Sequence, residues 1–482
     1  MPERHRLQSP SGGWFSRQRV LSESLGILVF IGLAGLGWHR IHLGVDLTDE
    51  GFYLSTPYRY TLGDLPFRDE TMNPYRMFDI LLAPVFRLWP GMTVLQARVL
   101  GLALDLGSLF AVYLLLKRRA PPILVALACV SGAFGCGNIW TPGYNLLGRD
   151  LLLLGVCAWL GSCLQTRPWA GRTLAFVGGV LACLSCIAYG PNVLIASVPL
   201  ALLAWLALRG RLRSPTAART LVFAASWGAL GLGCLATGLA SGLYADWRYA
   251  CAFQATLPAY SASLPARLRS FWSEGRPLVP PFLAALGGTG CVLALVSRAR
   301  SQRRWFWLAA ACGVSGGSAY ACTVYPSRFA PYALGDHVPF CVMMAALAFL
   351  AAAVLLPATA PDELRTDAAD GIFVRRALLT VVLLFAIIEG LGSANGLRNA
   401  LYGAGFLLAV AVAILSCRAD GAERAGALSL HQRVALQCCL GLACAAYGAL
   451  SIRSNFGHVC RDASTPQLTA RFTHPLLAGI RS

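Results

Sequence analysis

The stretch at residues 94–119, VLQARVLGLALDLGSLFAVYLLLKRR, decides the fold class of this chain. Residues 94–116 are mostly apolar, and as a helix they are long enough to cross about 30 Å of hydrocarbon. Lys117, Arg118 and Arg119 follow directly, and basic residues often flank a membrane span in this way. The stretch therefore predicts a transmembrane helix.

The composition extends this prediction to the whole chain. Of 482 residues, 56% are apolar and 13% are charged, and the mean hydropathy is +0.60. A soluble domain carries about a quarter charged residues, so a soluble globular protein is excluded. Similar apolar runs recur along the sequence and predict an all-α polytopic bundle of about 13 membrane helices. The expected spans are residues 21–38, 94–116, 121–137, 146–164, 173–189, 192–208, 220–243, 279–297, 305–325, 338–357, 377–391, 400–417 and 433–452.

The net charge of +18 does not indicate a nucleic-acid partner. The basic residues are spread over short loops between apolar runs and form no single basic stripe, a distribution typical of membrane topology. Alternate loops are richer in arginine, which predicts a cytoplasmic tail at residues 1–20 and a membrane domain at residues 21–452. The odd number of spans then places a short tail, residues 453–482, outside. The short spans near Tyr189 also fit a re-entrant pair.

Two expected outer segments, residues 39–93 and 244–278, are too long to be simple connections, and long ordered loops often carry function. Acids gather in the first of them, where they repel one another unless they meet a cation, a metal or a substrate proton. A solvated face at the membrane surface explains the same pattern equally well. These acids are Asp46, Asp49, Glu50, Asp64, Asp69, Glu70 and Asp79.

Other ionisable residues also have two interpretations. Asp105 and Glu389 lie inside expected spans, where acids are usually paired or functional. We expect structural pairing with Arg98 or Arg149, and proton-coupled transport is the alternative. His39 and His42, at i and i+3 with an acid close behind, fit a divalent cation or, more often, histidines at the membrane interface. No metal or other cofactor is assigned, and a divalent cation stays open.

The first outer segment also resembles a known family. The string Asp49-Glu50-Gly51-x-Tyr53 after a first membrane helix is similar to the signature of polytopic GT-C glycosyltransferases. Phe67-Arg68-Asp69 and the following spans are similar to the bacterial dolichyl-phosphate-mannose-protein mannosyltransferase-like and aminoarabinose-transferase-like group, over residues 20–200. Gly190-Pro191-Asn192 stands where relatives often have Lys-Pro-Asn.

The resemblance implies a bacterial inner-membrane enzyme that moves a sugar from a polyprenyl-phosphate-linked donor to a glycan, lipid or protein acceptor at the outer face. Short amphipathic helices of the first outer segment would pack over the outer mouth of the bundle. Asp49 is the expected base for the acceptor hydroxyl, and Glu50 and Asp69 are expected to shape its field or orient the acceptor. The expected partners are this donor, membrane lipids and the acceptor, and no nucleic acid.

The remaining site residues follow from the same chemistry. Arg328 and His337, in a short outer loop, are the candidates for the donor phosphate, because arginine binds phosphate oxygens bidentately. An arginine reaching lipid head groups explains that loop as well. Tyr53, Arg68 and Tyr75 are candidates for acceptor or donor contacts. A multispanning transporter or lipid flippase, and a scaffold without catalysis, are the competing functions.

Overall fold

The computed structural model describes residues 12–44, 49–69, 74–134 and 140–256, with scattered positions between residues 269 and 456. The elements of its continuous part are helical: α1 Gly12–Ile41, α2 Asp49–Leu62, α3 Phe78–Leu88, α4 Val94–Leu116, α5 Pro122–Phe134, α6 Tyr144–Leu164, α7 Pro168–Ala188, a 3-10 turn Gly190–Asn192, α8 Val193–Ala196, α9 Val198–Leu208, α10 Pro215–Ala240 and α11 Leu243–Thr256. The prediction of an all-α fold is confirmed for this part of the chain.

Six stretches of these helices are long and apolar enough to cross a membrane. They are Arg19–Ile41, Val94–Leu116, Tyr144–Leu164, Pro168–Ala188, Gly190–Leu208 and Pro215–Ala240, and the shorter apolar helix α5 adds to them. These seven segments correspond to the first seven expected spans. The polytopic membrane prediction is therefore confirmed, while the six later spans lie mostly outside the described residues.

Local sequence signals set the ends of these helices. At the start of α4, the Thr93 hydroxyl accepts a bond from the backbone N–H of Gln96 (3.3 Å), and the Gln96 side chain accepts one from the N–H of Thr93 (2.8 Å). This reciprocal arrangement satisfies two donors that a helix start leaves unpaired. Proline occupies the first helical position of α7 and α10, where its missing N–H costs nothing.

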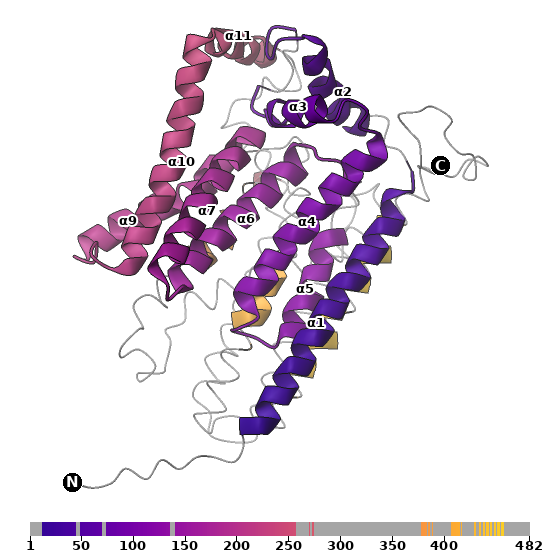
Figure 1. Ribbon diagram of the computed structural model, residues 1–482, viewed down its shortest axis with the longest axis vertical. Coiled ribbons are helices and arrows are strands. Elements are labelled where there is room, and N and C mark those ends of the chain that lie inside the picture. Colours follow the sequence, from indigo (N-terminus) through magenta and orange to yellow (C-terminus); the bar gives the residue numbers. More distant parts are fainter. Residues whose placement is uncertain are drawn as a thin grey trace.

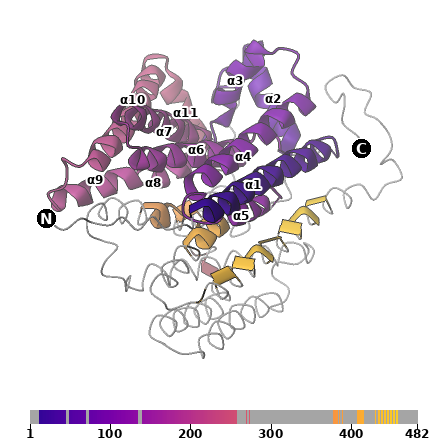
Figure 2. The ribbon, with the colours of Figure 1, turned by 60° about the horizontal axis from the view of Figure 1, so that its bottom comes forward.

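The bundle is ordered α10, α7, α6, α4, α1 from one side to the other, with α5 against α1 and α4 (Figures 1 and 2). Glycine allows the closest of these contacts. A side chain at Gly178 of α7 would meet the backbone oxygen of Gly155 in α6 at 2.8 Å, too close for a real Cβ contact. Small residues thus let α6 and α7 approach closely, as is common between membrane helices.

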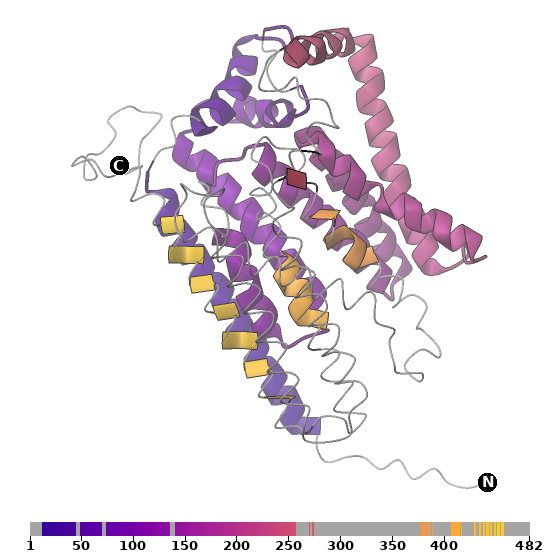
Figure 3. The ribbon, with the colours of Figure 1, turned by 180° about the vertical axis from the view of Figure 1, so that it is seen from behind.

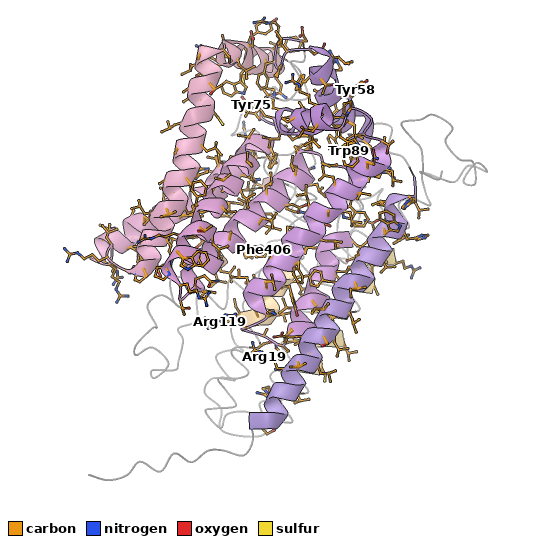
Figure 4. The ribbon with its side chains drawn as sticks, in the orientation of Figure 1. Arg19, Tyr58, Tyr75, Trp89, Arg119 and Phe406 are labelled. Atoms are coloured by element: carbon orange, nitrogen blue, oxygen red, sulfur yellow. The ribbon has the colours of Figure 1, made fainter. Side chains whose placement is uncertain are left out.

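The two ends of the bundle differ in chemistry. Helices α2, α3 and α11 form a layer across one end (Figures 1 and 3). The basic loops after α4, before α7 and between α9 and α10 lie at the other end, and Figure 4 labels Arg19 and Arg119 there, far from Tyr58, Tyr75 and Trp89. The segment expected to cap the outer mouth therefore does cap one end of the bundle.

Candidate active site

A buried ion pair anchors the first turn of α2. The Glu50 carboxylate, 3% exposed, accepts a forked pair of bonds from Arg98 of α4, at 2.7 Å from Nε and 2.6 Å from Nη2. The hydroxyl of Thr141 donates to the same carboxylate. Both oxygens of Glu50 are therefore occupied by strong donors.

Arg98 also holds the chain that joins α1 to α2. Its Nη1 donates to the carbonyl oxygen of Ile41 at 2.7 Å and to that of Leu43 at 3.3 Å, and its Nη2 donates to the carbonyl of Gly44 at 2.7 Å. These carbonyls belong to the end of α1 and the residues after it, where a helix leaves acceptors unpaired. One fully buried guanidinium thus fixes α1, α2 and α4 relative to one another.

The other predicted acids of this segment have different surroundings. Asp49 is the first residue of α2, and its side chain lies outside the described part, as do Asp46 and Glu70. Asp69 is exposed, and its Oδ2 accepts a bond from the backbone N–H of Leu65 at 2.7 Å. This bond closes the tight turn in which Phe67 has a φ of 65°, so Asp69 stabilises a backbone conformation that side chains rarely adopt.

Tyr53 belongs to an aromatic cluster beneath α2. Its ring meets those of Phe78 (5.4 Å between centroids) and Tyr144 (5.8 Å) nearly at right angles, a favourable edge-to-face geometry. The guanidinium of Arg76 lies 3.9 Å from the centre of the Tyr144 ring. Arg76 was not among the predicted residues, and its position one residue after the candidate Tyr75 is the signal that could have found it.

Arg68 and Tyr75 join the first outer segment to α11. Arg68 forms an exposed ion pair with Asp246 at 3.0 Å. The Tyr75 ring lies 6.4 Å from that of Trp247, whose indole N–H donates to the carbonyl of Pro74 at 2.8 Å. The structure therefore brings together two predicted outer segments that are more than 170 residues apart in sequence.

Cys251 lies on the same helix beside this junction. Burial raises the pKa of its thiol above the ordinary value, and a hydrogen bond with the Tyr75 side chain opposes part of that rise. Tyr75 itself is about half exposed. The junction thus combines exposed aromatic surface with a partly desolvated thiol that is protonated at neutral pH.

Gly190-Pro191-Asn192 lies between the stretch around Tyr75 and the membrane helices α6 and α7. The N–H of Gly190 donates to the carbonyl of Tyr75 at 3.0 Å. Asn192 is buried and donates to the carbonyl of Gly148 at 3.1 Å and to the hydroxyl of Ser185 at 2.8 Å. This segment therefore connects the stretch around Tyr75 to α6 and α7, and its described contacts are structural.

A second buried network lies deeper in the bundle. Asp105 of α4 pairs with Arg149 of α6 at 2.5 Å, which confirms the expected structural pairing with one of the two arginines proposed. The indole N–H of Trp140 also donates to Asp105, at 2.7 Å. Asp150 joins the network through Arg149 at 2.9 Å. The sequence signal for Asp150 was an adjacent Arg-Asp pair inside an apolar run, which sequence reasoning missed.

Only some of the remaining predicted site residues lie in the part of the chain that the structure describes. Arg328, His337 and Glu389 lie outside the described residues. The Nδ1–H of His42 donates to the carbonyl of Trp38 at 2.6 Å, and His39 stacks against Phe456. In the part of the chain that the structure describes, no group of three or more His, Cys, Asp or Glu side chains could hold a metal ion.

Comparison with known proteins gives a likeness in fold alone. No family model and no curated protein matches the chain. Among solved structures, the oligosaccharyltransferase of Archaeoglobus fulgidus in the apo form is 16% identical to this chain, with a TM-score of 0.49. The match covers 92% of this chain and 56% of the oligosaccharyltransferase. The archaeal oligosaccharyltransferase AglB of Archaeoglobus fulgidus, in complex with an inhibitory peptide and a dolichol-phosphate, is 14% identical with a TM-score of 0.44; the match covers 92% of this chain and 56% of AglB.

This chain spans little more than half the length of those structures. At such identity and TM-score, the likeness carries no information about what this chain binds or transfers.

Proposed function

We propose that this chain is a membrane glycosyltransferase of the GT-C type, which moves a sugar from a polyprenyl-phosphate-linked donor to an acceptor at the outer face of the membrane. The proposal rests on the resemblance of Asp49-Glu50-Gly51-x-Tyr53 and Phe67-Arg68-Asp69 to the GT-C motifs. The bacterial subgroup and the hexosyl or pentosyl nature of the donor belong to the same proposal.

The division of labour between the two adjacent acids carries the proposal. Glu50 accepts two bonds from Arg98 and one from Thr141, so both of its oxygens are already engaged in holding α2 to its neighbours. The donors of Arg98 are used by Glu50 and by the carbonyls of Ile41, Leu43 and Gly44. Glu50 then positions the start of α2, and Asp49 accepts the proton of the acceptor hydroxyl as the glycosidic bond forms.

The neighbouring contacts support a site between the first outer segment and α11. Arg68 and Tyr75 both contact α11, and Tyr75 offers an exposed ring beside Trp247. Aromatic faces and arginines suit a polar acceptor that carries sugar or phosphate groups. Asp69 orients the acceptor indirectly, by holding the turn that presents Arg68. For the donor phosphate, Arg328 and His337 stay the proposed ligands.

The proposed setting is the bacterial inner membrane. Residues 1–20 would be cytoplasmic, residues 21–452 would form the membrane domain, and residues 453–482 would lie outside. The gathering of basic loops at the end opposite α2 and α3 supports this orientation, because such loops prefer the cytoplasmic side.

The test is transfer by the purified protein from a polyprenyl-phosphate sugar in lipid nanodiscs. Asp49→Asn keeps size but cannot accept a proton, so we expect a loss of about 10²-fold or more in rate with donor binding retained. Asp64→Asn is the matched control, since this acid lies in the same segment and pairs with Arg59 at 2.6 Å. Near-normal turnover by Asp49→Asn, with a Glu50→Gln variant that is folded but inactive, would give the base role to Glu50. Retention of activity by both would refute the catalytic assignment.

A transporter or flippase is the alternative, and it would use Asp105 and Glu389 for coupling. Asp105 accepts hydrogen bonds from Arg149 and Trp140, and these bonds favour a structural role for this acid instead. Transport of a lipid-linked sugar across vesicles by a protein that transfers no sugar would favour the alternative.

A further inference from the structure

The network around Arg149 has an imbalance of charge. Its guanidinium contacts two carboxylates, Asp105 at 2.5 Å through Nη2 and Asp150 at 2.9 Å through Nε. All three side chains are buried, and Asp150 is fully so. Among the described residues, neither acid pairs with another Lys or Arg.

A buried carboxylate without its own counter-charge is costly, above all within a membrane helix. Asp105 lies in α4 and Asp150 in α6, both of which are candidate spans. The thiol of Cys129 in α5 also lies near Asp105, and it supplies no positive charge. One bound proton would make the network neutral.

The contacts of Ser108 indicate where that proton lies. Its Oγ is 2.9 Å from the backbone carbonyl oxygen of Asp105 and 3.0 Å from Oδ1 of Asp150. A serine hydroxyl has one hydrogen to donate, and both neighbours are acceptors when Asp150 is ionised. If Oδ1 of Asp150 carries a proton, its hydroxyl donates to Ser108 and its oxygen still accepts the Nε–H of Arg149. Ser108 then donates to the carbonyl, and both of its contacts become hydrogen bonds.

The surroundings of the two acids agree with this placement. Both oxygens of Asp105 accept an N–H, one from Arg149 and one from Trp140, which favours the charged form. Oδ2 of Asp150 is buried and has no hydrogen-bond partner. An oxygen left without a donor is tolerated better on a neutral carboxylic acid than on a carboxylate.

We propose that Asp150 is a proton-binding site inside the bundle, so that Asp105, Arg149, Ser108 and protonated Asp150 form one neutral network that fastens α4 to α6. The proton remains on Asp150 at neutral pH. This inference is independent of the proposed glycosyl transfer and concerns the membrane core of the protein.

Infrared spectroscopy of the full chain in nanodiscs tests the proposal directly. With ¹³C-labelled aspartate, we expect a protonated carboxylic acid band at pH 7 that shifts with the isotope and disappears in Asp150→Asn. This variant stays neutral, and its amide oxygen can still accept the Nε–H of Arg149, so we expect it to fold. Asp246→Asn, which removes a partly exposed acid far along the chain in α11, should leave the band unchanged. In Ser108→Ala the band should persist at a shifted frequency, because the acid loses its acceptor.

Absence of a labelled carboxylic acid band in the wild-type protein at pH 7 would overturn the proposal, and that measurement needs no variant. A band that survives in folded Asp150→Asn would place the proton on another aspartate and overturn it equally. If Asp150→Asn does not fold, Asp105→Asn decides. Without the charge of Asp105, the charges of Asp150 and Arg149 balance among the described side chains, so Asp150 should ionise and the band should disappear; a persistent band would contradict the charge argument.

Discussion

Removal of Arg98 or Glu50 should destabilise the protein strongly. Arg98 donates to both oxygens of Glu50 and to three backbone carbonyls, and both side chains are buried. Removing one member of a buried ion pair leaves the other charge unpaired, at a cost of about 3–5 kcal/mol. Glu50→Leu leaves the guanidinium with carbonyl partners only, and we expect a loss in this range. Arg98→Leu also deprives three carbonyls of a donor, so we expect a loss at or above its upper end.

The double variant Glu50→Leu/Arg98→Leu separates the energy of the ion pair from the energies of the other contacts that each residue makes. With both charges gone, no unpaired charge stays buried, so the combined loss should fall below the sum of the single losses by about 2–3 kcal/mol. Unfolding in mixed micelles with increasing SDS, followed by tryptophan fluorescence and far-UV circular dichroism, measures the three free energies. Arg59→Leu/Asp64→Leu is the matched control, because that pair is partly exposed and should couple by less than about 1 kcal/mol. Additive losses for Glu50 and Arg98 would refute the role assigned to this pair.

Three further predictions concern topology, the α11 junction and helix packing. On a background without other reactive cysteines, an impermeant maleimide added outside should label Asp64→Cys and not Arg213→Cys; the reverse would invert the orientation. Arg68→Ala breaks an exposed ion pair, so SDS unfolding should change by less than about 1 kcal/mol, while acceptor affinity in the transfer assay should fall. Gly101→Ala places a methyl group against the carbonyl of Trp140 and should cost about 1–3 kcal/mol in the same unfolding experiment, whereas no loss would show that the segment after residue 139 can move aside.

The apolar runs predicted the membrane helices because their length and composition are local properties. Residues 94–116 match α4 at both ends, where a capping Thr93 and the basic residues that begin at Lys117 mark the limits. The prediction started α7 at residue 173, but the helix begins at Pro168, since a proline at the first helical position and Arg172 in the second turn are both tolerated at a membrane boundary.

The partners of buried charges were harder to predict, because pairing depends on contacts between distant segments. The sequence offered Arg98 and Arg149 as partners for the intramembrane acids. Arg149 does pair with Asp105, 44 residues away, while Arg98 pairs with Glu50, 48 residues away at the start of α2. No periodicity distinguishes these two choices. The motif that marks Glu50 as a candidate catalytic acid also gives no sign that the Glu50 carboxylate is paired with a guanidinium.

The two buried networks share one short segment of chain. Trp140 donates to Asp105, and the next residue, Thr141, donates to Glu50. On α4, Arg98 and Asp105 are seven residues apart, which is two helical turns and about 10 Å along one face. Gly101 lies between them and lets α4 approach the carbonyl of Trp140. The segment that precedes α6 therefore holds the network that positions α2 and the network that joins α4 to α6, so a displacement of Trp140 and Thr141 would disturb the start of α2 and the membrane core together.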